Sequence, residues 1–130
     1  MADEGPLLLS IVELGGYPDF GPLYRQAGFR VRTERSMRRA LAAARRERPA
    51  VIVAEFNYQS DFRDRTSSLE SLMAVVQSLG DVHVIVFYEQ EFAHQLKRLS
   101  DRFAFHALLP YPIEPDLLRQ ALVSARRETP

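Results

Sequence analysis

Short, nearly uninterrupted apolar blocks alternate along the chain with segments of helical spacing, and this alternation constrains the fold more than any other feature. Three blocks are almost wholly apolar, a fourth is weaker, and a fifth alternates apolar with polar residues: 7–12, 50–54, 82–87, 104–109 and 29–33. Continuous apolar blocks are typical of strands covered on both faces, whereas alternation indicates a more exposed edge strand. The sequence therefore predicts five strands.

The segments between these blocks carry apolar residues at helical spacing: 19–27, 37–44, 69–79, 92–103 and 115–125. Ser36 stands where an N-cap is expected, and Pro49 and Gly80 end the second and third segments. Strands that alternate with helices imply right-handed crossovers and a parallel sheet. We therefore expect an α/β fold of the flavodoxin-like, doubly wound class, with five strands in the order 2-1-3-4-5 and helices on both faces.

Composition narrows the function classes. The chain has 130 residues, of which 46% are hydrophobic, so we expect one domain over residues 1–130 with a core from about 6 to 127. Lysine plus arginine equal aspartate plus glutamate at 17 each, so no overall charge would attract nucleic acid or an anionic membrane. The absence of cysteine excludes disulfides and thiolate chemistry and fits the cytoplasm. No apolar run is long enough to cross a membrane.

A local excess of arginine between Arg30 and Arg48 departs from this balance. Aromatic residues that could stack on bases are not interleaved with these arginines, so the pattern favours a solvated helix face over a nucleic-acid site. The three histidines His83, His94 and His106 do not show metal-ligand spacing, and we expect His83 to be a core histidine with a backbone partner.

In doubly wound sheets the functional crevice lies beyond the carboxyl ends of the strands. Four residues follow or end the predicted strands and should meet at that rim: Glu13, Glu55, Tyr88 and Tyr111. The two tyrosines could also line a pocket for a small planar ligand.

Two segments resemble the receiver domain of two-component response regulators: "RPAVIVAEF" at 48–56 and "YPIEPDLLRQAL" at 111–122. The resemblance extends from Leu7 to Arg127. It implies a bacterial, cytoplasmic signalling module whose partners are a kinase, another regulator or a second copy of itself.

The same resemblance implies that the phosphorylation chemistry is missing. The acidic pair of the family aligns with Val12 and Glu13, so one acid remains, and the phosphoacceptor aspartate aligns with Glu55. The hydroxyl residue aligns with Tyr88, and the lysine aligns with Tyr111, whose bond to Pro112 we expect to be cis. Tyrosine supplies no positive charge to a phosphoryl group. The resemblance therefore predicts a pseudo-receiver that is not an enzyme and needs no cofactor or metal.

Alternatives stay open at this site. Glu55 could imitate a phosphorylated aspartate, although a solvated rim carboxylate is the simpler reading. Glu13 and Glu55, helped by Asp19 and Asp61, could hold Mg²⁺ weakly. The chain could also be an active phosphoacceptor, or a sensor of a small ligand.

A contact surface is expected around the fourth predicted helix and the start of the fifth, where receivers dimerise. Its residues are Phe92, Gln95, Leu96, Lys97, Arg98 and Leu99, of which the apolar ones must also serve the core. The long loop after the third strand carries Phe56, Tyr58 and Phe62, which either fold back over the pocket or bind a partner.

Overall fold

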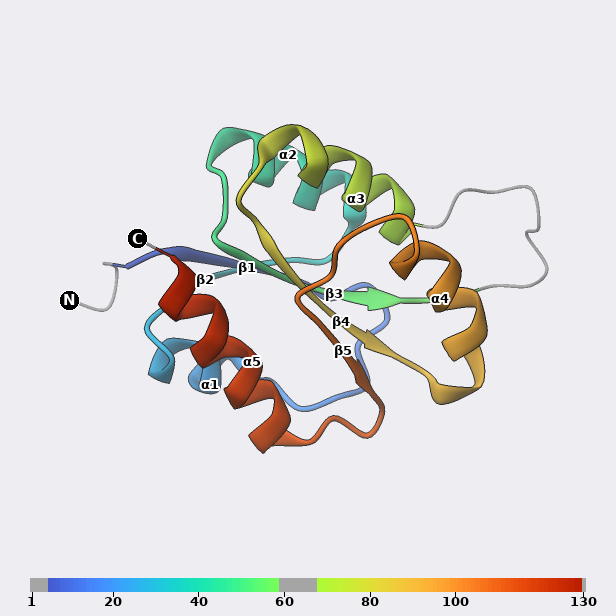
Figure 1. The fold of residues 1–130 in the computed structure, drawn as a ribbon. Helices are drawn as coiled ribbons and strands as arrows, with labels where there is room; N and C mark the ends of the chain where they lie inside the picture. The colour runs from blue at the N-terminus through green and yellow to red at the C-terminus, as the bar shows by residue number, and fades with distance from the viewer. Residues whose placement is uncertain (1–4, 59–67, 130) are drawn as a thin grey trace.

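Five parallel strands form one sheet in the computed structural model, which describes residues 5–58 and 68–129 (Figure 1). The strands are β1 (Leu7–Ile11), β2 (Arg30–Glu34), β3 (Val51–Phe56), β4 (His83–Tyr88) and β5 (Ala107–Pro110). Their order in the sheet is β2-β1-β3-β4-β5. The predicted fold class and strand order are confirmed.

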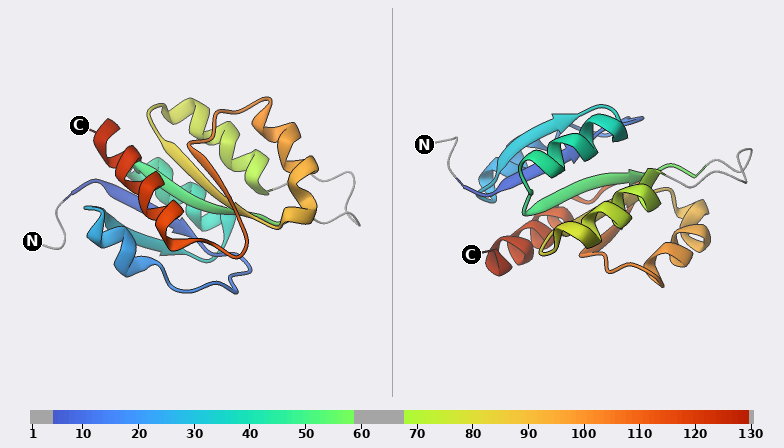
Figure 2. Two further views of the ribbon diagram at one scale, coloured as in Figure 1. Left: turned by 60° about the horizontal axis from the view of Figure 1, so that its bottom comes forward. Right: turned by 90° about the horizontal axis from the view of Figure 1, so that it is seen from above.

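Helices cover both faces of this sheet (Figures 1 and 2). They are α1 (Gly21–Gln26), α2 (Met37–Arg46), α3 (Ser68–Leu79), the 3₁₀ turn η1 (Gln90–Phe92), α4 (Ala93–Ser100) and α5 (Pro115–Glu128). α1 and α5 lie on one face, and α2, α3 and α4 lie on the other. No helix in the described part of the chain is long and apolar enough to span a membrane.

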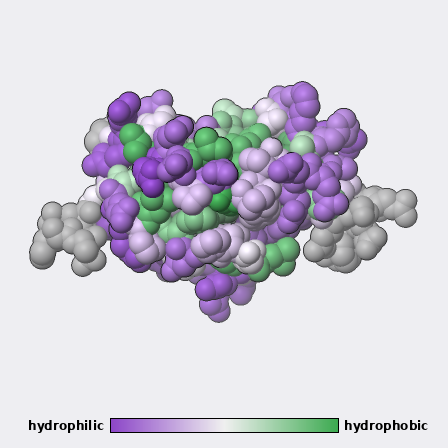
Figure 3. Space-filling view, turned by 90° about the horizontal axis from the view of Figure 1, so that it is seen from below, coloured by the Kyte–Doolittle hydropathy of each residue, from purple (hydrophilic) through white to green (hydrophobic). Residues whose placement is uncertain are grey.

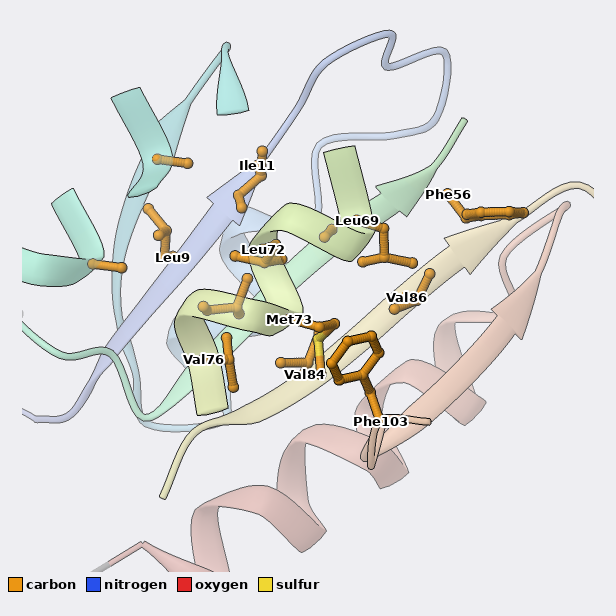
Figure 4. Packing of buried hydrophobic residues seen from close by; sticks show 14 of the residues in the cluster. Leu9, Ile11, Phe56, Leu69, Leu72, Met73, Val76, Val84, Val86 and Phe103 are labelled. Carbon is orange, nitrogen blue, oxygen red and sulfur yellow. The ribbon is translucent and has the colours of Figure 1, made fainter. Parts of the chain in front are cut away.

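Two apolar clusters fill the space between the sheet and its helices. Side chains along a strand point alternately to opposite faces, so Leu9 belongs to the cluster beneath α2, α3 and α4, whereas Leu8 belongs to the one beneath α1 and α5. Figure 4 shows the first cluster, in which Met73 of α3 lies close to Val84 of β4 and Phe103. Because the two clusters cover both faces of the sheet, the strand sequences are almost continuously apolar.

Local signals explain the ends of several elements. The Ser36 side chain accepts a hydrogen bond from the Arg39 backbone at 3.2 Å and caps α2. The edge strand β2 is only partly buried, as its alternating pattern predicted. Gly80, at φ 71°, ends α3.

Two elements begin two or more residues later than predicted, while the other starts agree to within one residue. α1 begins at Gly21 rather than Asp19, because the Asp19 carboxylate accepts a hydrogen bond from the Gly21 amide at 2.8 Å and forms a turn before the helix. β5 begins at Ala107 rather than at residue 104. The Phe103 amide still bonds back to Leu99 at 2.8 Å, so the chain leaves the α4 turn late.

Candidate functional site

The Glu55 side chain lies at the carboxyl edge of β3 and is only 1% exposed. Its Oε1 accepts hydrogen bonds from the Leu14 amide at 2.9 Å and from Asn57 Nδ2 at 3.0 Å. Its Oε2 accepts from the Gly15 amide at 3.2 Å and from the Tyr17 hydroxyl at 2.6 Å. A carboxylate offers about four lone-pair positions. Four donors therefore occupy its acceptor capacity.

The expectation that Glu55 is a solvated rim carboxylate is wrong. The loop between β1 and α1 folds over it and donates three of its four hydrogen bonds. This turn needs two consecutive residues in the left-handed region, which Gly15 (φ 70°) and Gly16 (φ 86°) supply at little cost. The adjacent glycines are thus the sequence signal of a loop that binds the carboxylate through its backbone.

Glu13, the other acid of the predicted site, is half-buried in the same region. Burial raises its pKa, a hydrogen bond with the Ser68 side chain lowers it, and the charge of Glu55 raises it, with a net increase. Its Oε1 is buried and has no hydrogen-bond partner among the described residues. An unpartnered buried oxygen next to a second carboxylate favours the protonated form of Glu13.

An aromatic layer covers the Glu55 carboxylate from the α1–α5 side. The ring of Tyr17 stacks on Tyr111 at 6.0 Å between centroids and meets Phe87 edge-on at 5.1 Å. Phe20 packs against both Tyr17 and Phe87. Burial raises the pKa of Tyr17, and so does its hydrogen bond with Glu55, so the phenol stays protonated and donates. Tyr17 is the site residue that sequence reasoning missed, although it directly follows the two glycines.

The predicted rim residues share one sheet edge but not one pocket. Tyr88 aligns with Phe56 and Pro110 across the sheet. Its side chain packs on the α2–α4 cluster, whereas Tyr111 packs on the α1–α5 cluster. The two rings lie on opposite faces because they sit at positions of opposite parity in neighbouring strands. They do not wall the single ligand pocket considered above. The Tyr111–Pro112 bond is cis, as predicted.

The surface predicted around α4 is smaller than the sequence suggested. Leu96 and Leu99 are 2% and 6% exposed and belong to the core, so they offer no contact area. Gln95 is half-buried, while Lys97 and Arg98 are exposed. The sequence predicts that the apolar residues of this helix serve both a contact surface and the core. Because both leucines point inward, they serve only the core.

The loop aromatics fold back onto the protein as far as they are described. Phe56 is 3% exposed and lies 6.2 Å from Tyr58, which in turn lies 5.3 Å from Phe92. These two rings fold back onto the α2–α4 face and not over Glu55, which is covered from the α1–α5 face, so the expectation that they cover the pocket is wrong for both. Phe62 and Asp61 lie outside the described residues.

No protein-family model and no curated protein matches the sequence. Solved structures do share its fold. A two-component transcriptional regulator from Clostridium phytofermentans superimposes with a TM-score of 0.73 at 17% identity, over 94% of each chain. The chemotaxis protein CheY4 of Vibrio cholerae gives 0.71 at 19% identity, over 94% of this chain and 99% of its own. The signal receiver domain of a modulated diguanylate cyclase from Desulfovibrio desulfuricans gives 0.73 at 14% identity, over 96% of each chain. The fold is that of receiver domains.

Proposed function

We propose that this chain is a regulatory module with a receiver fold that does not accept a phosphoryl group and acts by binding signalling proteins in the bacterial cytoplasm. The observation that carries the proposal is the state of Glu55: the carboxylate at the phosphoacceptor position is buried and accepts four hydrogen bonds from its own chain.

Phosphoryl transfer to a carboxylate needs a free oxygen lone pair in line with the leaving group. It also needs cations that neutralise the transferring oxygens. Every lone-pair direction of Glu55 meets a donor, and the Tyr17 ring stands between the carboxylate and the α1–α5 side. The position that aligns with the family lysine is Tyr111, a neutral phenol with a raised pKa. Glu55 therefore has no free acceptor position among the described residues, and Tyr111 supplies no charge at the position of the family lysine.

The same contacts argue for one fixed conformation. A protein that switches needs an element that can move between two discrete arrangements. Here Glu55 binds the β1–α1 loop through Leu14, Gly15 and Tyr17, and the aromatic layer packs Tyr111 in place. The negative charge of Glu55 serves this internal contact and is not presented to a partner.

A phosphoryl donor tests this directly. The chain is incubated with Mg²⁺ and acetyl phosphate, and separately with Mg²⁺ and beryllium fluoride, and its intact mass and amide NMR spectrum are followed. We expect no phosphoryl adduct and no shift of the Leu14, Gly15 or Glu55 amides. The Glu55→Asp variant should also remain unlabelled, because Tyr111 still supplies no charge. An adduct mapped to residue 55 or to a neighbouring aspartate would establish the active phosphoacceptor instead.

We place the partner contact at the β5 edge of the sheet, between α4 and the start of α5. Lys97 and Arg98 are exposed there, and Leu117 on the first turns of α5 is 47% exposed. Figure 3 shows the α1–α5 face, on which apolar side chains appear between hydrophilic ones. Exposed apolar area beside positive charge suits a partner with an acidic rim, and a second copy of the chain is the alternative.

Reversing the charge of Lys97 and Arg98 tests whether the partner binds at this edge. The wild-type chain and a Lys97→Glu/Arg98→Glu variant are used to capture proteins from the native cell, with Arg45→Glu/Arg46→Glu on α2 as a control of equal charge change. We expect a histidine kinase or regulator to be captured by the wild type and the control and to be lost with the α4 variant. Equal capture by all three chains would remove the contact from this edge. Sedimentation of the three chains then measures self-association.

A further inference from the structure

A second cluster of titratable side chains lies at the opposite edge of the sheet from Glu55. His83 is the first residue of β4, His106 directly precedes β5, and Glu128 is the last residue of α5. These histidines show no metal-ligand spacing along the chain, because they come from separate elements. The fold joins them, since two parallel strands begin at this edge and α5 ends there (Figure 1).

One ring nitrogen from each histidine and one carboxylate oxygen of Glu128 lie within 4.8 Å of one another. His83 Nε2 is 2.7 Å from Glu128 Oε2. The two imidazole rings are 5.0 Å apart and nearly perpendicular, at 86°. Two imidazoles and a carboxylate form the ligand set of many zinc sites with an open fourth position.

Backbone carbonyls hold the other ring nitrogens. His106 Nε2 lies 3.0 Å from the Ala121 carbonyl oxygen, and His83 Nδ1 lies 3.4 Å from that of Ala50. A carbonyl only accepts, so the tautomers that donate at these contacts leave Nδ1 of His106 and Nε2 of His83 for coordination. Metal-binding histidines commonly have this outer hydrogen bond, which fixes the tautomer and aims the free lone pair.

The contact between His83 and Glu128 has room for a cation when His83 directs its Nδ1 proton to Ala50. With its Nδ1 proton directed to Ala50, His83 presents Nε2 to a carboxylate, which also only accepts. Two acceptors at 2.7 Å repel unless a proton or a metal ion lies between them. A divalent ion at this point would also contact His106, which a proton does not.

We propose that His83, His106 and Glu128 bind a zinc ion, with water as the fourth ligand. Tetrahedral zinc places its ligand atoms about 3.3 Å apart, so His83 Nε2 and Glu128 Oε2 must separate by about 0.6 Å, and the widest pair must close by at most about 1.5 Å. Glu128 has 58% of its side chain exposed at the last turn of α5 and is free to make that movement. The carboxyl end of a helix also favours a cation.

The cavity beside His83 and Glu128 would let an ion reach these side chains from solvent. His83 and Glu128 line a cavity of about 710 Å³ that also includes Asp81 and the paired side chains of Arg30 and Glu47. The Arg30 charge is offset by its ion pair with Glu47. Zinc here would tie the end of α5 to the amino ends of β4 and β5. This inference does not depend on the proposed function.

Zinc binding is measured by titration calorimetry on the untagged 130-residue chain, with Mg²⁺ as the comparison ion. We expect one Zn²⁺ per chain, a higher Tm with zinc, and no response to Mg²⁺, because an ion that binds only the folded state stabilises it. Cobalt in place of zinc should give the visible absorption of a tetrahedral nitrogen–oxygen site.

Three variants locate the site. His106→Gln and Glu128→Gln should each weaken zinc affinity at least tenfold and reduce the cobalt absorption. His94→Gln, which changes an exposed histidine on α4, is the matched control and should bind as the wild type does. Glu128 is exposed, so its variant keeps the fold, and circular dichroism checks this for all three. Absence of zinc binding by the wild type, or equal affinity of Glu128→Gln and His94→Gln, would overturn the proposal.

Discussion

Replacing Glu55 by glutamine removes one charge from the buried site and keeps the shape of the side chain. The best placement keeps the amide oxygen at the Oε1 position, where it still accepts from Leu14 and Asn57. The amide nitrogen then takes the Oε2 position. The Tyr17 hydroxyl can turn and accept from it, but the Gly15 amide is left facing a second donor.

The expected loss follows from these contacts. One unpaired amide at a site that is 1% exposed costs roughly 1 to 3 kcal/mol. The surviving hydrogen bonds lose their charge assistance, but removal of a buried charge returns part of that energy. We therefore expect Glu55→Gln to lower the free energy of unfolding by about 2 to 3 kcal/mol.

Urea denaturation followed by far-ultraviolet circular dichroism measures this change. A domain of this size has a slope of roughly 1 to 3 kcal/mol per molar urea, so the midpoint should fall by about 1 M or more. Glu91→Gln is the control, because it makes the same chemical change at an exposed residue and should shift the midpoint little.

A double-mutant cycle identifies the contact responsible. Tyr17→Phe removes only the hydroxyl that donates to Glu55 at 2.6 Å. Combined with Glu55→Gln, it should cost about 1 kcal/mol less than the sum of the two single changes. Wild-type stability for Glu55→Gln, or strict additivity in the cycle, would refute the view that this carboxylate holds the β1–α1 loop.

Three further outcomes are expected. Glu13 has a pKa above its ordinary 4.5, so its contribution to stability is full below that pH and falls as pH rises through the folded-state pKa. Glu13→Gln should therefore be more stable than the wild type at neutral pH and equal to it near pH 3. Urea denaturation midpoints at the two pH values measure this difference. Burial raises the pKa of Tyr17, Tyr24 and Tyr111 above the ordinary 10.0, so an ultraviolet titration should show these three phenols still protonated at pH 11. Their contribution to stability is present below pH 10 and is lost above it. Ionisation of all the tyrosines of the folded chain near pH 10 would contradict this. Leu96→Ala should lower the free energy of unfolding by about 2 to 5 kcal/mol, because a side chain only 2% exposed leaves a cavity, whereas a surface role would change stability by less than 0.5 kcal/mol or so.

The strand order was predictable because each apolar block has a local signature and the crossover rule limits how parallel strands connect. The clustering of Glu13 and Glu55 at one edge followed from that topology. The burial of Glu55 did not, because it depends on how the β1–α1 loop turns, and periodicity does not describe a loop. Gly15 and Gly16 marked the turn, yet its direction became clear only once the Leu14 amide was seen to donate to Glu55.

The meeting of His83, His106 and Glu128 was equally hidden from linear spacing. Metal motifs are recognised when ligands share one helix or one hairpin, because their separation is then fixed. Here each ligand comes from the end of a different element, and the register of β4 and β5 sets the distance between them. The same reasoning explains Tyr88 and Tyr111, which the alignment placed in one pocket and the pleat of the sheet placed on opposite faces.

Glutamate at position 55 is better explained by this internal contact than by phosphoryl chemistry. Its extra methylene carries the carboxylate about 1.5 Å farther than aspartate would reach. That length lets it meet the amides of Leu14 and Gly15 and the hydroxyl of Tyr17 together. An aspartate would stop short and leave three donors unpaired beneath the aromatic layer. In the proposed function, the residue that prevents in-line attack is thus also the one that the closed loop requires, so one contact accounts for both proposed properties.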